Sequence, residues 1–191
     1  MTDVELSQDA ATLLARVTAA LGNPARLGVA FSGGVDSSVL LAVATRSLGP
    51  SRTLAVLGVS ASLAGAERRE AHAVAAAIGA PRVDLVTNEL ERPEYRANGP
   101  DRCFHCKTEL FERIDDELVS RYGLSAVAYG ENADDARRPD RPGAQAATNH
   151  QVLRPLAEGL PPEELEAVRR FAAELRVEAA KRQEQERRVA A

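Results

Sequence analysis

The chain has 191 residues and a net charge of −4, and 45% of its residues are hydrophobic, whereas 4% are aromatic and Trp is absent. This composition predicts one globular α/β domain with a core of Ala, Val and Leu, and it disfavours a broad nucleic-acid-binding surface. The acidic start lacks the features of a secretion signal, and no apolar run approaches the ~20 residues of a membrane span, so neither export nor membrane insertion is expected.

Hydrophobic periodicity predicts alternating helices and strands along most of the chain. In chain order, the predicted elements are a helix over 8–21, a strand over 27–31, a helix over 36–48, a strand over 53–59, a helix over 67–78, a strand over 82–87, a loop over 88–100, a helix over 102–121, a strand over 126–129 and a loop over 136–151. Such alternation is typical of βαβ units, so the predicted fold class is α/β, with a parallel, twisted, Rossmann-like sheet flanked by helices.

A last helix is predicted to begin at the prolines at 161 and 162, because proline is favoured in a first helical turn. We therefore expect a domain over 1–160 and a C-terminal helix with a charged tail over 161–191. Two pairs of opposite charge four residues apart, Glu178 with Arg182 and Glu184 with Arg188, are typical of a solvated helix. A frayed tail and a partner-binding tail are the alternatives.

The turn before the helix over 36–48 has the composition of a phosphate-binding loop. Its glycines let the backbone approach an anion, and the first N–H groups of a helix have no partner within the helix. The helix dipole adds partial positive charge at the same place. Asp36 would repel a phosphate unless Mg²⁺ lay between them, so Asp36 is a candidate magnesium ligand. The predicted nucleotide-binding residues of the turn are Ser32, Gly33, Gly34, Val35, Asp36, Ser37 and Ser38.

Two further segments come directly after strands. Ligands of parallel sheets bind beyond the carboxyl ends of the strands, where Val59, Gly130 and Asn132 are predicted to contact the nucleotide. Asp134 and Asp135 form a pair of carboxylates that suits Mg²⁺ or a ribose hydroxyl, and a helix cap or a turn is the alternative. All three strand ends are expected to converge in one cleft.

Arginines follow this segment. In a loop beside an anionic site they clamp a carboxylate or a phosphate, and otherwise they form a solvated basic loop. The arginines concerned are Arg137, Arg138, Arg141 and Arg154, of which Arg138 and Arg141 are candidate substrate contacts.

Cys103 and Cys106 form a C-x-x-C pair at the start of a predicted helix. The spacing places both near one helical face, where the dipole and the neighbours Arg102 and Lys107, themselves candidate substrate contacts, favour thiolates. The pair fits half a zinc site, a redox pair, two ligands of an iron–sulfur cluster or sulfur-handling thiols, as well as two ordinary cysteines. His105 is expected to point away as a surface imidazole. Two cysteines without a signal predict a cytoplasmic, reducing location.

The run S-G-G-V-D-S-S resembles the signature of the PP-loop ATP pyrophosphatases, of the adenine nucleotide alpha hydrolase type, which split ATP between its α- and β-phosphates. With the cysteine motif added, the chain resembles the ATP-dependent sacrificial sulfur transferases that mature the nickel-pincer cofactor of lactate racemase. The resemblance covers about residues 8–176, and the matching segments are 32–38, 86–90, Tyr95, 102–107, 109–111, 130–135, 141–143 and 154–156.

The resemblance implies two chemical steps. ATP with Mg²⁺ adenylates a carboxylate of a pyridinium mononucleotide and releases pyrophosphate, and a sulfur nucleophile then displaces AMP, which leaves far more readily than oxide. Asp36, Cys103 and Cys106 would be catalytic, and Mg²⁺ would be held by Asp36, Asp134 and Asp135. The cysteines would give the sulfur or hold an iron–sulfur cluster shared between chains, and a homo-oligomer is expected.

The chain also departs from this family. Members continue beyond the equivalent of residue 191 and carry a Pro-Ala-Ser-x-Cys-like stretch, whereas no cysteine follows Cys106 here, and Glu131 stands where Thr is usual. The sulfur is therefore expected from Cys103, from Cys106 or from a partner protein. The alternative functions are a tRNA thiolase, an amide-forming enzyme of the NAD or GMP synthetase type, and a non-catalytic ATP-binding subunit completed in trans.

Overall fold

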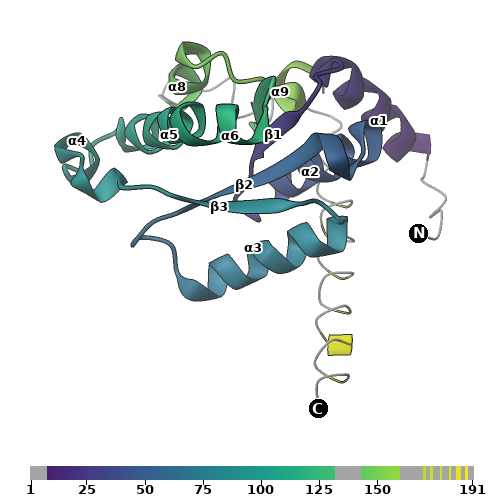
Figure 1. The fold of residues 1–191 in the computed structure, drawn as a ribbon, viewed down its shortest axis with the longest axis horizontal. Coiled ribbons are helices and arrows are strands. Elements are labelled where there is room, and N and C mark those ends of the chain that lie inside the picture. Colours follow the sequence, from purple (N-terminus) through teal and green to yellow (C-terminus); the bar gives the residue numbers. More distant parts are fainter. Residues whose placement is uncertain are drawn as a thin grey trace.

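The computed structural model describes residues 8–131 and 143–159, together with residues 170, 173, 177, 181, 184, 185 and 188. Within these residues, four parallel strands form one sheet in the order β3-β2-β1-β4, and helices cover both of its faces (Figure 1). The strands are β1 (Leu27–Ala30), β2 (Thr53–Val59), β3 (Arg82–Val86) and β4 (Ala126–Tyr129). The α/β prediction with a parallel sheet is confirmed.

The central strand β1 pairs with β2 on one side and with β4 on the other, with Leu27 opposite Thr53 and opposite Ala126. The first five residues of β2 are all buried. An apolar run without alternation is typical of a parallel strand that is covered on both faces. Because all four strands run the same way, their carboxyl ends meet at one edge of the sheet.

Each face of the sheet has its own hydrophobic core, because successive strand residues point to opposite faces. Val29 and Ala55 pack in one core with α1 (Gln8–Leu21), α2 (Val35–Leu48), α3 (Gly65–Ile78) and α9 (Pro155–Gly159). Leu54 and Val56 pack in the other core with α5 (Arg102–Arg113), the π-helical segment η3 (Ile114–Val119) and α8 (Gly143–Asn149). Helices α2 and α5 therefore lie on opposite faces.

The segment predicted as a loop over 88–100 contains two short helices, so that prediction was wrong in part. They are η2 (Glu89–Glu91) and α4 (Pro93–Arg96). Pro93 begins α4, where its missing N–H and fixed φ are tolerated. A third short helix, η1 (Pro50–Arg52), follows α2.

The helix predicted over 102–121 consists of α5, η3 and α6 (Ser120–Tyr122), and its C-cap is Gly123, whose φ is +63°. The loop predicted over 136–151 was wrong for its second half, which forms α8. A Cβ at Gly143 would lie 2.8 Å from Lys107 Nζ. Because Gly143 has no side chain, α8 can pack closely on α5. Ala146 and Ala147 of α8 are buried there.

Most of the predicted C-terminal helix and charged tail lies outside the described residues, as do residues 132–142. Among the helices that are described, none combines the length and apolar character needed to traverse a lipid bilayer.

Candidate functional site

The turn between β1 and α2 is held together by its own hydroxyl groups. The Ser37 and Ser38 side chains donate to the carbonyl oxygen of Gly34, at 3.1 and 2.7 Å, and the Ser32 amide donates to Ser37 Oγ at 3.3 Å. Gly34 is the N-cap residue of α2, and no side chain caps this end of the helix. The first-turn amides are therefore not occupied by a capping side chain, which fits the predicted phosphate site.

Two glycines allow backbone segments to meet closely at this turn. Gly33 has a φ of +78°, and a Cβ there would lie 2.9 Å from the Cβ of Ala71 in α3. A Cβ at Gly130, just after β4, would lie 2.7 Å from the amide nitrogen of Ser37. Gly34 is less constrained, because its φ is −69° and a Cβ would meet only Ser32 Oγ, at 3.3 Å.

A cavity of about 430 Å³ opens beside the turn, at the carboxyl edge of the sheet. Its polar lining residues are Ser32 and Ser37 of the turn, Ser60 and Ser62 after β2, Thr87 and Glu89 after β3, Cys106 and Lys107 of α5, and Glu131 after β4. The structure thus brings the phosphate loop, the stretch after β2 and Gly130 together, as the sequence predicted. It adds one of the two cysteines to the same cavity.

The other predicted nucleotide contacts lie around this cavity. Asp36 is half-buried in the first turn of α2, next to Ser37. The side chains of Val35 and Val59 pack against the hydrophobic core, and the residues on either side of Val59 line the cavity. Ser38 is buried, and its hydroxyl holds the turn rather than facing the cavity.

Glu89 is a cavity residue that the sequence analysis missed. It is buried, and its Oε1 accepts hydrogen bonds from Ser62 Oγ at 2.8 Å and from Ser60 Oγ. Burial opposes its ionisation, but hydrogen bonds from Ser60, Ser62, Thr87 and the backbone together outweigh burial and lower the pKa of Glu89. The cavity therefore holds a fixed negative charge between the turn after β2 and α5. The feature of the sequence that could have indicated a polar site here is the pair of hydroxyl residues, Ser60 and Ser62, that follows β2.

Cys103 and Cys106 are both free, exposed cysteines in the first turns of α5, and Cys106 lines the cavity. Desolvation of its thiol raises the pKa of Cys106, and the negative charge of Glu89 adds to this effect. Arg102 and Lys107 act in the opposite direction without prevailing. The expectation that the helix start and these two cations favour a thiolate was therefore wrong for Cys106, because its thiol is desolvated and also faces the buried carboxylate of Glu89.

The residues beside the cysteines are engaged within the chain. Arg102 donates to Tyr95 Oη at 2.6 Å, and its guanidinium lies 4.4 Å from the centre of the Tyr95 ring. Lys107 Nζ lies 4.2 Å from the centre of the Tyr129 ring, at the cavity wall. His105 Nε2 lies 3.1 Å from Asp101 Oδ2, which lowers the pKa of Asp101.

The described residues supply only part of the predicted metal chemistry. Within them, no group of three or more His, Cys, Asp or Glu side chains is arranged to hold a metal ion. Cys103 and Cys106 are thus two thiols of the several that an iron–sulfur cluster needs, so this donor set does not fit a cluster by itself. Five predicted site residues lie outside the described part of the chain, namely Asn132, Asp134, Asp135, Arg138 and Arg141.

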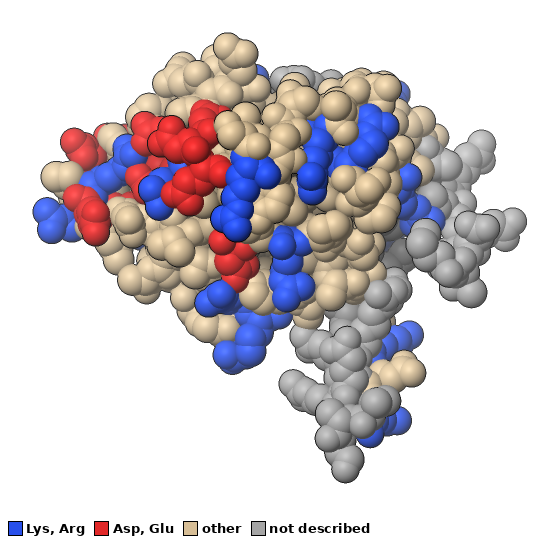
Figure 2. All heavy atoms as spheres, in the orientation of Figure 1, with Lys and Arg blue, Asp and Glu red and all other residues tan. Residues whose placement is uncertain are grey.

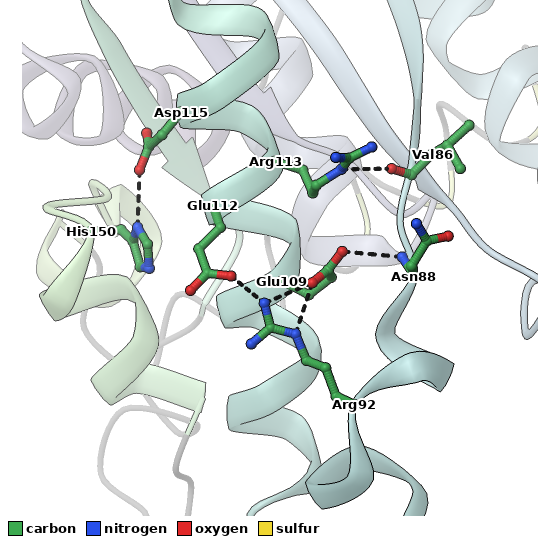
Figure 3. Close-up of polar contacts among 8 residues, drawn as sticks. All are labelled: Val86, Asn88, Arg92, Glu109, Glu112, Arg113, Asp115 and His150. Atoms are coloured by element: carbon green, nitrogen blue, oxygen red, sulfur yellow. Dashed lines mark hydrogen bonds and ion pairs between the residues drawn. The ribbon is translucent and has the colours of Figure 1, made fainter.

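A polar network anchors α5 to the end of β3 (Figure 3). Glu109 is buried in α5, accepts from the Asn88 amide at 3.1 Å, and accepts from Arg92 Nε at 2.8 Å. Arg92 also pairs with Glu112, and Arg113 Nε donates to the carbonyl oxygen of Val86 at 3.3 Å. These contacts hold the helix that carries both cysteines at the carboxyl edge of the sheet.

We expect Glu109→Ala to lower the free energy of unfolding by about 1–3 kcal/mol, because it leaves a buried amide and part of a guanidinium without an acceptor. Glu112→Ala is the matched control: its side chain is 43% exposed against 10% for Glu109, so its loss is expected to stay below about 1 kcal/mol. Urea unfolding followed by circular dichroism measures both. Equal losses in the two variants would contradict the anchoring role of Glu109.

Acidic side chains gather over the end of the molecule that carries α4 and α5, with basic ones among them, whereas Lys and Arg are spread over the rest of this face (Figure 2). Both kinds of charge are expected on the surface, because the chain has 24 Lys and Arg and 28 Asp and Glu residues. The face in view thus presents interspersed charges rather than a single field of one sign.

The amino-acid sequence is similar to a known protein family and to two curated proteins. The family model for asparagine synthase matches residues 10–128. The uncharacterized protein slr1717 of Synechocystis sp. (strain ATCC 27184 / PCC 6803 / Kazusa) is 41% identical over 130 residues, which are 68% of this chain and 47% of that protein. Pyridinium-3,5-bisthiocarboxylic acid mononucleotide synthase of Lactiplantibacillus plantarum is 32% identical over 136 residues, 71% of this chain and 49% of that protein. The chain thus spans about half the length of these curated relatives.

Two solved structures share the fold. The glutamine-dependent NAD+ synthetase from Acinetobacter baumannii, in complex with ADP, has a TM-score of 0.63 and 14% identity over 90% of this chain and 34% of that one. The U34-tRNA thiolase NcsA from Methanococcus maripaludis, with its [4Fe-4S] cluster, has a TM-score of 0.59 and 15% identity over 87% of this chain and 65% of that one. At these identities the likeness concerns the fold alone.

Proposed function

Because the chain belongs to the asparagine synthase family of ATP-using PP-loop proteins, we propose that it adenylates a carboxylate substrate with ATP and then transfers sulfur to it. The first step releases pyrophosphate, and the second releases AMP and leaves a thiocarboxylate. The relative from Lactiplantibacillus plantarum, whose name states a bisthiocarboxylic product, supports a pyridinium dicarboxylate mononucleotide as the substrate class.

One observation carries the proposal: a single cavity joins the uncapped start of α2 to Cys106. The amides of the first turn of α2 would bind the phosphates and stabilise the charge that develops on pyrophosphate as it leaves. Because Gly33 and Gly130 have no side chains, the backbone can close around these amides and form a cradle for the phosphates. An activated carboxyl carbon in the cavity would then lie between a phosphate site and a thiol.

Mg²⁺ suits this site, because Asp36 places a carboxylate within the turn that would bind phosphate. When bound, the ion neutralises phosphate charge and polarises the bond that breaks. Lys107, at the cavity wall, is positioned to attract the anionic substrate. Arg138 and Arg141 remain proposed substrate contacts, and Asp134 and Asp135 remain proposed ligands of the ion.

The test is turnover of the purified chain with ATP, Mg²⁺ and a pyridinium dicarboxylate mononucleotide, followed by mass spectrometry. We expect AMP, pyrophosphate and a product in which sulfur replaces a carboxylate oxygen. A reaction that omits the mononucleotide controls for plain ATP hydrolysis. If neither AMP nor a thio-product forms, the proposed function is wrong.

A second candidate is an ATP-binding subunit that a partner protein completes in trans. It is favoured by the donor set of the described residues, in which Cys103 and Cys106 are two free thiols and no group of three or more His, Cys, Asp or Glu side chains could hold a metal ion. Calorimetry separates the two candidates, because heat of ATP binding without any release of AMP by the purified chain supports the subunit.

A further inference from the structure

The two cysteines have unequal positions in the site. Cys106 lines the cavity, whereas Cys103 is exposed one turn earlier in α5 and does not line it. A nucleophile that reaches a substrate in the cavity must therefore come from Cys106. Both cysteines are exposed, so a sulfur donor can reach Cys106 from solvent and an external thiol can reach Cys103.

The pair is also spaced for a disulfide. Residues three apart in an α-helix have Cα atoms about 5 Å from each other, which lies within the roughly 4.4–6.8 Å found in disulfides. The pair lies in the first turns of α5, and the contact between Glu109 and Arg92 holds the helix further along, so a shift at the start of the helix could bring the β-carbons into disulfide range. The two sulfurs can thus alternate between thiols and a disulfide while α5 stays in place.

Building on the proposed function, we propose that Cys106 carries the transferred sulfur as a persulfide and that Cys103 resolves it. The sulfur comes from a persulfide donor, whose terminal sulfur moves to the Cys106 thiol and which leaves as a thiol. The added sulfur extends Cys106 by one S–S bond of about 2 Å into the cavity, toward an adenylate held at the start of α2.

Two bond exchanges then complete the transfer. The deprotonated terminal sulfur attacks the adenylate carbon, a C–S bond forms, and the C–O bond to AMP breaks with its electron pair leaving on AMP. The Cys103 thiolate next attacks Sγ of Cys106, so that the S–S bond to the substrate breaks and the thiocarboxylate leaves with that electron pair. The transferred sulfur is reduced, the two thiols are oxidised to a disulfide, and an external dithiol restores them.

This scheme leaves the protein intact, unlike donation of the cysteine's own sulfur. It also uses both thiols without a further protein ligand, which agrees with the two-thiol donor set of the described residues. The roles are not interchangeable, since only Cys106 faces the cavity.

The experiment compares four forms of this chain: wild type, Cys103→Ser, Cys106→Ser and the double variant. Each is charged with glutathione persulfide, freed of excess donor, and mixed with ATP, Mg²⁺ and a pyridinium dicarboxylate mononucleotide without reductant. Pyrophosphate reports the first half of the reaction, and the ratio of thio-product to pyrophosphate reports the second half. Intact-protein mass spectrometry follows sulfur loading and adducts, and circular dichroism checks that each variant is folded.

We expect wild type to release thio-product and to end with a Cys103–Cys106 disulfide. Cys103→Ser should retain the substrate as a mixed disulfide on Cys106, its product ratio should fall at least roughly tenfold, and added dithiothreitol should restore the product. Cys106→Ser and the double variant should release pyrophosphate without thio-product.

Three outcomes would overturn the inference while leaving the proposed function standing. They are product release by Cys103→Ser at the wild-type ratio without reductant, dehydroalanine at Cys106 after turnover, and thio-product from Cys106→Ser. Absence of pyrophosphate release from all four proteins would instead remove the proposed function and this inference with it.

Discussion

Asp36→Ala is expected to reduce magnesium-dependent pyrophosphate release by roughly 10²–10³-fold while the fold is retained. Asp36 lies in the first turn of α2, next to the cavity, and is half-buried. Its proposed task is to hold the ion that neutralises the phosphates, and alanine offers no oxygen for that task. Loss of a carboxylate from a first helical turn costs only about 0.3–1 kcal/mol of stability, so catalysis and folding separate clearly.

Glu67→Ala is the matched control, because Glu67 is also an acid in the first turn of a helix, α3, and is exposed. It should show a similar small change in thermal stability and full pyrophosphate release. A magnesium titration of release rates distinguishes a weakened ion site from other defects. Wild-type rates and magnesium dependence in Asp36→Ala would remove the metal role assigned to this residue.

Gly130→Ala is expected to abolish ATP binding and to lower the free energy of unfolding by about 1–3 kcal/mol. The new Cβ would lie 2.7 Å from the Ser37 amide nitrogen and 2.8 Å from the Asp36 carbonyl carbon. Both are backbone atoms, so the methyl group cannot be accommodated by turning a side chain. The end of β4 must move away from α2, and the cradle opens.

Gly65→Ala is the control for this substitution. Gly65 begins α3, and a Cβ there would meet only the end of the Arg69 side chain, at 3.5 Å. The control should bind ATP as wild type does and be equally or slightly more stable. Isothermal titration with ATP and urea unfolding measure both quantities, and tight ATP binding by Gly130→Ala would show that the strand end is not part of the cradle.

The sheet and the turn before α2 were predictable because their signals are local. A continuous apolar run marks β2, and glycine and serine before an apolar helix mark the turn. The helices at α4 and α8 were missed because they are short and depend on tertiary contacts. The sequence near Gly143 does not indicate that the Lys107 side chain packs against this glycine.

The electrostatics of the site were the least predictable part. Near Cys106 in sequence, Arg102 and Lys107 are cations that lower the pKa of its thiol. Desolvation raises this pKa most, and the next largest contribution comes from Glu89, which is 17 positions earlier in sequence. The serines beyond β2 donate hydrogen bonds that offset the burial of the Glu89 carboxylate. A sequence shows which charges are adjacent in the chain, and only the fold shows which ones share a cavity.

The division of the interior into two separate cores has a consequence for the evolution and redesign of this chain. Helix α2 is stabilised through one core and helix α5 through the other, with the sheet as a partition between them. Substitutions that remodel α5 should therefore leave the energetics of α2 almost untouched, and their effects on stability should add. Helix α5, which carries both cysteines, can in this sense be redesigned separately, so that other nucleophiles are tried beside an unaltered turn between β1 and α2.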